Sequence, residues 1–281
     1  MRLRRTILPT AMCFLMGSLV SPATAQETEE TRVKARLVTD TAAVEPGMTF
    51  WVGVQFEIED GWHIYWRNPG GAGLATAVDI DLPDGFVAGP LQWPLPIEFE
   101  QSDGIPGFGY EGSVVLASEV TVPEDFDRSR SPQIRVEVSW LACKGVCVLG
   151  SADLDGSLAK LPAEPVFREW SRGLPRPFAE GEAPFSLTAM GGLAQGTITQ
   201  WLRWREPPQS VEWFPDPSGA LELDNVRVQT RGGLTRIDAT VRRRKGAEGL
   251  TDDISSLVVV TGQDGDRRGW ELLVDLTNKK G

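Results

Sequence analysis

Alternating apolar and polar residues, interrupted by proline and glycine, restrict the fold of this chain more than any other feature. Between 49 and 58 every second residue, from Phe50 to Ile58, is apolar and shares one face. We expect further strands at 62–67, 78–82, 113–122, 134–140, 146–158, 185–189, 197–204, 221–230, 234–243, 255–261 and 270–275. Little of the chain has a helical pattern. The sequence therefore predicts an all-β fold, an antiparallel β-sandwich followed by a second β-sandwich.

The segment 161–177 divides this pattern. It carries four prolines, and 164–172 has the composition of a short helix. Domain boundaries commonly fall in such proline-rich stretches. We therefore predict a first β-sandwich over residues 26–163, and a linker with a second β-sandwich over residues 164–281.

The first 25 residues have the three parts of a secretory signal peptide. Arg2, Arg4 and Arg5 precede a mostly apolar stretch, and Ala23-Thr24-Ala25 is a small-residue cleavage site. No later stretch approaches 18 apolar residues, so we expect no membrane span after signal cleavage. The predicted location is the periplasm, where disulfides form and persist.

The charge of the chain and its motifs exclude several functions. The formal net charge is −11, which disfavours nucleic acid and anionic membranes as partners. The sequence has neither a G-x-S-x-G nucleophile motif nor a phosphate-binding P-loop. We therefore expect no hydrolase or phosphoryl-transfer chemistry.

The cysteines give the chemical signal. Cys13 lies in the predicted signal, which leaves Cys143 and Cys147 as one close pair. Closing so small a loop stabilises a fold by roughly 2 kcal/mol, against nearly 5 kcal/mol for a loop of about a hundred residues. A domain of this size can bury a normal core without such a staple. Gly145 permits the turn and Lys144 favours a nearby thiolate, so a redox pair is the favoured interpretation.

Two alternatives to a redox pair remain open. The two thiolates together with His63, the one histidine of the chain, form a candidate ligand set for copper or zinc. The second alternative is a non-catalytic adaptor made of two β-domains, in which the disulfide is structural. The redox interpretation requires no metal or organic cofactor.

Four short motifs occur in one order: GWHIYWRNPGGAG at 61–73, QWP at 92–94, FGYEG at 108–112 and WLACKGVC at 140–147. Together they resemble the N-terminal periplasmic domain of DsbD-type thiol:disulfide interchange proteins, and most closely the ScsB-like branch. The motifs span residues 33–160, and the second half resembles the second β-domain of that branch more weakly.

The resemblance implies an immunoglobulin-like sandwich with the cysteine pair at one end of its sheets. It also implies a protein-disulfide reductase or electron carrier. A membrane protein or a thioredoxin-like domain would donate the electrons, and oxidised periplasmic proteins would accept them. Family members continue into membrane and thioredoxin-like domains, whereas this chain ends at Gly281. The electron donor is therefore expected on another polypeptide.

Roles for single residues also follow from the resemblance. Cys147 matches the cysteine that forms the mixed disulfide, and Cys143 matches the resolving cysteine. His63 and Tyr65 match positions near the pair. The sequence departs from the family at 148–150, where Val-Leu-Gly stands in place of the Pro-Glu that often follows the second cysteine.

The family has a cap loop whose aromatic side chain shields the cysteines. Carried over by motif, the cap is the segment 108–112, with Phe108 or Tyr110 covering the sulfurs and Glu111 beside them.

Overall fold

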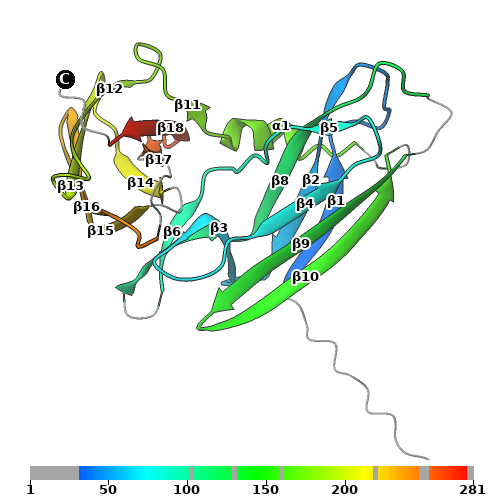
Figure 1. Cartoon of the computed structure of the whole chain (residues 1–281), viewed down its shortest axis with the longest axis horizontal. Coiled ribbons are helices and arrows are strands. Elements are labelled where there is room, and N and C mark those ends of the chain that lie inside the picture. Colours follow the sequence, from blue (N-terminus) through cyan, green and yellow to red (C-terminus); the bar gives the residue numbers. More distant parts are fainter. Residues whose placement is uncertain are drawn as a thin grey trace, which may run out of the picture. The chain divides into compact units, whose positions relative to one another are not determined.

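The computed structural model describes residues 32–101, 104–127, 132–158, 161, 163–217, 221–246 and 253–276. Strands account for nearly all of the regular structure (Figure 1). No helix in this part of the chain is long and apolar enough to cross a membrane. The predicted signal peptide, residues 1–25, lies outside the described residues.

The described residues of the first half form ten strands in two antiparallel sheets. The strands are β1 (Val33–Thr39), β2 (Thr49–Ile58), β3 (His63–Gly70), β4 (Ala77–Asp81), β5 (Val87–Ala88), β6 (Ile97–Glu100), β7 (Pro106–Tyr110), β8 (Ser113–Thr121), β9 (Gln133–Lys144) and β10 (Val146–Ser157). One sheet has the order β1-β2-β8-β5, and the other has the order β10-β9-β3-β7-β6 with β4 beside β9. The antiparallel sandwich predicted from the alternation is confirmed.

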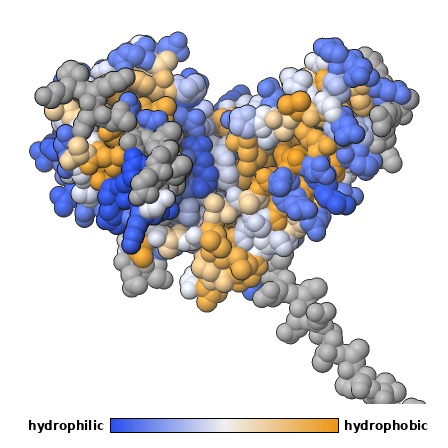
Figure 2. Space-filling model, viewed as in Figure 1, coloured by the Kyte–Doolittle hydropathy of each residue, from blue (hydrophilic) through white to orange (hydrophobic). Residues whose placement is uncertain are grey.

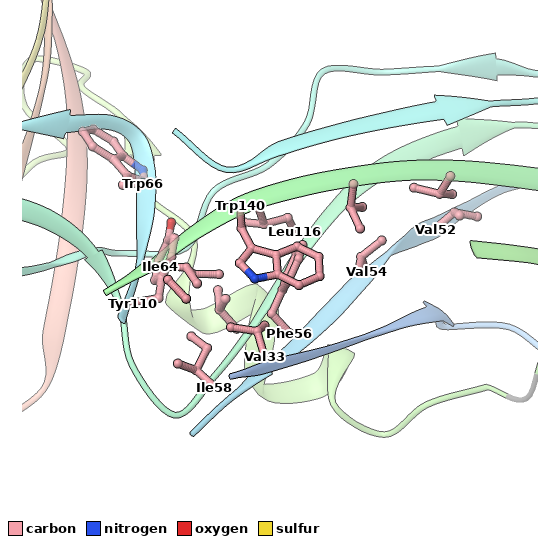
Figure 3. Packing of buried hydrophobic residues seen from close by; sticks show 14 of the residues in the cluster. Val33, Val52, Val54, Phe56, Ile58, Ile64, Trp66, Tyr110, Leu116 and Trp140 are labelled. Atoms are coloured by element: carbon pink, nitrogen blue, oxygen red, sulfur yellow. The ribbon is translucent and has the colours of Figure 1, made fainter. Parts of the chain in front are cut away.

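The core of this sandwich lies between the two sheets. Every second residue of β2 from Phe50 to Ile58 is buried, as the sequence pattern predicts. The Phe56 ring meets the Trp140 ring of the opposite sheet edge-on, with centroids 5.7 Å apart (Figure 3). Burying one such large apolar side chain stabilises the fold by roughly 1.5–3 kcal/mol. Burial of this stripe fixes the register, because a slip of one residue would turn every apolar side chain to solvent.

The second half forms another pair of four-stranded sheets around a core of its own. Its strands are β11 (Arg176–Pro177), β12 (Phe185–Gly192), β13 (Thr197–Trp204), β14 (Ser210–Pro217), β15 (Leu221–Arg231), β16 (Leu234–Arg243), β17 (Asp253–Thr261) and β18 (Arg267–Asp275). The sheet orders are β11-β18-β17-β14 and β12-β13-β16-β15. Among the described strand pairs of this half, only the short β11 pairs in parallel, with β18. The predicted all-β fold therefore extends through both halves.

The expected short helix lies between the two halves, as α1 (Phe167–Trp170) followed by a turn of 3-10 helix. Phe167 and Trp170 form a small buried cluster with Val115 and Ala117 of β8. The Trp170 Nε1–H donates a hydrogen bond of 2.8 Å to the Val115 carbonyl. The segment is therefore fastened to the first sandwich. The predicted domain division at 163/164 stays a prediction.

The two halves also share buried apolar residues. Phe214 of β14 and Leu257 and Val259 of β17 belong to the first sandwich's core cluster. The Phe214 ring lies 5.1 Å from the Phe108 ring and 6.1 Å from the Trp66 ring. Residues 31–281 accordingly cluster as one compact unit.

Candidate functional site

The cysteines lie at the turn that joins β9 and β10, two strands that run side by side to the lower end of the view in Figure 1. Cys143 and Cys147 are directly opposite each other in this hairpin, with Cα atoms 4.1 Å apart, and they form a disulfide. Gly145 forms the turn with a φ of 71°, a conformation that side chains disfavour. The pairing of Cys143 with Cys147 in the hairpin thus places the two sulfurs within bonding distance.

The two cysteines differ in exposure. Cys143 is 4% exposed, whereas Cys147 is an exposed residue of the strand that leaves the turn. Disulfide exchange requires a thiolate to reach one sulfur of the bond, and access decides which sulfur is attacked. An incoming thiolate therefore meets Cys147, and Cys143 becomes the leaving sulfur.

The strand register decides which side chains share a face with the disulfide. His63 of β3 pairs with Cys143 of β9, and Tyr65 of β3 pairs with Gly109 of β7. Side chains alternate between faces along a strand, so His63 and Tyr65 lie on the face of Cys143. The same rule puts Phe108 and Tyr110 on the opposite face, toward the core.

An aromatic cluster lies on the cysteine face. His63 contacts the Phe99 ring of β6 at a centroid distance of 3.8 Å, and Tyr65 lies 5.4 Å from His63 and 5.8 Å from Phe99. Gly107 makes room for Phe99, because a Cβ at this position would lie 2.3 Å from the ring. The motifs in the sequence do not identify Phe99. The one signal is the alternation of Ile97 and Phe99, with eight residues between Phe99 and the FGYEG motif.

The Tyr65 hydroxyl connects this cluster to the disulfide. It lies 3.4 Å from the Cys143 Sγ and 3.1 Å from the Gln101 Oε1, and both atoms can accept its hydrogen. Burial raises the pKa of Tyr65 above its ordinary value of 10.0, so the hydroxyl keeps its proton at neutral pH. The site therefore has a hydrogen-bond donor aimed at the leaving sulfur.

The structure places the remaining residues predicted for the site elsewhere. Phe108 lies in the core against Phe214. Tyr110 points into the core cluster (Figure 3), where its hydroxyl donates a 2.8 Å hydrogen bond to the Pro94 carbonyl. Glu111 is exposed in the turn after β7. The Lys144 ammonium donates a 2.8 Å hydrogen bond to the Asp60 carbonyl.

These placements leave a compact candidate site. The structure brings together Cys143, Cys147, His63, Tyr65 and, in addition, Phe99. Within the described residues, no group of three or more histidine, cysteine, aspartate or glutamate side chains is arranged to hold a metal ion.

Comparison with known families bears directly on this site. The model of the N-terminal region of the thiol:disulfide interchange protein DsbD matches residues 34–158, which include both cysteines and the aromatic cluster. Residues 34–158 are similar to a DsbD N-terminal domain. The cysteine pair of this chain therefore lies in a segment that is similar to a family of thiol:disulfide interchange proteins.

One solved structure has a similar fold over most of the chain. The N-terminal periplasmic domain of ScsB from Proteus mirabilis has a TM-score of 0.66 at 18% identity, covering 90% of this chain and 97% of that chain. At this identity the likeness shows a shared fold alone, and it extends beyond the DsbD N-terminal domain into the second sandwich. A chicken T-cell receptor has a TM-score of 0.25 at 7% identity, covering 87% of this chain and 100% of that chain. No curated protein matches the sequence.

The environment of His63 gives a prediction about pH. Its Nε2 atom is buried with no hydrogen-bond partner among the described residues, and burial lowers the pKa of His63 below 6.5. Below about pH 6.5 the unfolded chain then binds a proton that the folded chain does not bind, so the free energy of unfolding falls as the pH is lowered through this range.

Urea unfolding at about pH 7.5 and about pH 5.5 measures this change, and His63→Gln should make it smaller. The chain has one histidine, so a single imidazole resonance in NMR reports the pKa directly. A pKa at or above 6.5 would contradict the prediction.

Proposed function

We propose that this protein is a periplasmic thiol:disulfide interchange protein, a protein-disulfide reductase or electron carrier. The observation that carries the proposal is the pairing of an exposed Cys147 with a buried Cys143 whose sulfur lies within reach of the Tyr65 hydroxyl. A disulfide that only stapled the hairpin would need neither an accessible sulfur nor a donor at the leaving one. The match of residues 34–158 to the DsbD N-terminal model supports the same chemistry.

The proposed reaction has two thiol–disulfide exchange steps. A thiolate of the electron donor attacks the Cys147 Sγ, the Cys143–Cys147 bond breaks, and its electron pair leaves on Cys143 as a thiolate. The Tyr65 hydroxyl donates its hydrogen bond to that thiolate, which makes Cys143 a better leaving group. The second thiolate of the donor then attacks the donor sulfur that is bonded to Cys147. This step closes the donor disulfide and releases Cys147 as a thiolate.

Two electrons and two protons pass in this reaction, so the donor dithiol becomes a disulfide and this domain becomes a dithiol. Reduction of an acceptor runs through the same steps in reverse. Cys147 attacks the acceptor disulfide, and Cys143 then attacks Cys147 and releases the reduced acceptor. The two sulfurs carry both electrons, so the cycle needs no organic cofactor or metal.

The surface around Cys147 supports a protein partner. Val146 and Leu149 are 65% and 68% exposed, although both are apolar. Figure 2 shows hydrophobic residues at the lower edge of the view, where Figure 1 places the β9–β10 turn. Exposed apolar patches of this kind mark interaction sites. We assign the donor to a thioredoxin-like domain or a membrane electron-transfer protein, and the acceptors to oxidised periplasmic proteins.

The shielding role in this proposal belongs to Phe99. Its ring packs on His63 and lies near Tyr65 on the cysteine face, whereas Phe108 and Tyr110 project into the core. In this proposal the cap is the Phe99 ring of β6, and not Phe108 or Tyr110 of β7.

Exchange with a thioredoxin-like protein tests the proposed function. The oxidised protein is mixed with one equivalent of reduced thioredoxin, and free thiols are alkylated at intervals. We expect Cys143 and Cys147 to become reduced as the thioredoxin becomes oxidised. If the thioredoxin stays reduced while the protein remains folded and oxidised, the proposal is wrong.

A further inference from the structure

The strand that carries His63 and Tyr65 is also the strand held by the second sandwich. In β3, Arg67 and Asn68 follow Tyr65 by two and three residues, which is about 7–10 Å along an extended strand. The Arg67 guanidinium lies between two carboxylates of the second half, 2.7 Å from Asp216 of β14 and 3.0 Å from Glu271 of β18. We call these three residues the ion-pair clamp.

Further contacts support the same end of β3. The Arg67 guanidinium stacks over the Trp66 ring at 4.6 Å from its centroid. The Asn68 side-chain amide donates a hydrogen bond of 2.5 Å to the Pro215 carbonyl of β14. Ion pairs that are fully exposed contribute little, but Arg67 and Asp216 are both about three-quarters buried. The clamp therefore fixes a specific position of β3.

β3 makes few regular pairs with β7 in the segment that carries Arg67. β3 pairs with β7 at Ile64 and Tyr65, and the register then shifts before pairing resumes at Gly70. Between these points the regular ladder does not set the position of β3. Arg67 of the clamp lies in this interval, two residues past the last regular pair at Tyr65.

We propose that Arg67 is a positioning residue for disulfide exchange, and that the second sandwich serves to hold the Tyr65 hydroxyl at the Cys143 sulfur. The inference rests on the proposed function, because it assigns Arg67 a role in the same reaction. Arg67 acts through β3 and does not contact either sulfur. A shift of β3 away from β9 would lengthen and weaken the hydrogen bond of 3.4 Å between the Tyr65 hydroxyl and the Cys143 Sγ.

The test is a double-mutant cycle on the rate at which excess dithiothreitol, an uncharged thiol, reduces the disulfide. We expect Arg67→Ala to slow reduction about threefold, less than the effect of Tyr65→Phe. In the Tyr65→Phe background, Arg67→Ala should have no further effect, because the hydroxyl that it positions is already absent. Arg67→Lys keeps the charge and should restore part of the rate.

The controls separate positioning from general destabilisation. Arg236→Ala removes an ion pair with Asp238 on β16 of the second sandwich and should leave the rate unchanged in both backgrounds. Glu271→Gln weakens the clamp without removing Arg67, and it should slow reduction less than Arg67→Ala does. Urea unfolding confirms that each variant is folded during the assay.

Two results would overturn the proposal. One is a wild-type rate for folded Arg67→Ala. The other is an effect of Arg67→Ala that is equally large with and without the Tyr65 hydroxyl, since this shows that Arg67 does not act through Tyr65. Neither result bears on exchange with thioredoxin, so the proposed function can stand or fail independently.

Discussion

Cys147→Ser should abolish disulfide exchange with a thioredoxin-like protein, because it removes the one exposed sulfur of the pair. Cys143 is 4% exposed and lies on the face covered by the aromatic cluster, so it cannot take over the attack. The assay measures thioredoxin oxidation over time by alkylation of free thiols. A Cys13→Ser background removes the third cysteine of the chain.

Cys143→Ser is the matched variant. It retains the Cys147 thiol but removes the sulfur that resolves the mixed disulfide. When it is mixed with an oxidised partner, we expect a covalent adduct through Cys147 that accumulates and disappears on reduction. Exchange at the wild-type rate by Cys147→Ser, or an adduct through Cys143, would reverse the roles assigned to the two cysteines.

Tyr65→Phe should slow reduction of the disulfide about tenfold, because a hydrogen bond to a charged group contributes about 1.5 kcal/mol and 1.4 kcal/mol corresponds to a factor of ten. The substitution removes the hydroxyl that lies 3.4 Å from the Cys143 Sγ and keeps the ring in the cluster. The rate is measured with excess dithiothreitol, by alkylation of the thiols that appear.

Tyr110→Phe provides the control, since the chain has only two tyrosines. It removes a hydroxyl that binds the Pro94 carbonyl on the core side of the sheet. This variant should lose about 1 kcal/mol of stability and reduce at the wild-type rate. Equal rates for Tyr65→Phe and wild type would exclude Tyr65 from the reaction.

Local pattern was sufficient for most of the fold. Every second residue of β2 is apolar because one face is buried, and the expected strand 49–58 matches the observed bounds. The cysteine hairpin was also predictable, because Gly145 permits a tight turn between two alternating segments. Strand β14 was not predicted, because it contains Pro215 and Pro217. Proline within a sheet is largely confined to edge strands, and β14 is an edge strand.

The aromatic part of the site depends on long-range register. Phe99 and Phe108 both precede the turn at Gly112, and the sequence does not tell which of them faces the cysteines. The answer requires the pairings of Tyr65 with Gly109 and of Ile97 with Gly109, which put Phe99 on the cysteine face. Similarly, the strand expected at 62–67 continues to Gly70. The Asn68 side chain in this extension binds the Pro215 carbonyl, almost 150 residues later in the chain.

The reduction potential of the Cys143–Cys147 disulfide tests the central claim most directly. The purified protein is equilibrated in glutathione or dithiothreitol buffers, and the free thiols are trapped and counted. We predict a value between about −180 and about −270 mV, the range of known exchange catalysts. A value well below about −300 mV would mean that the bond is a structural staple and would contradict the proposed function.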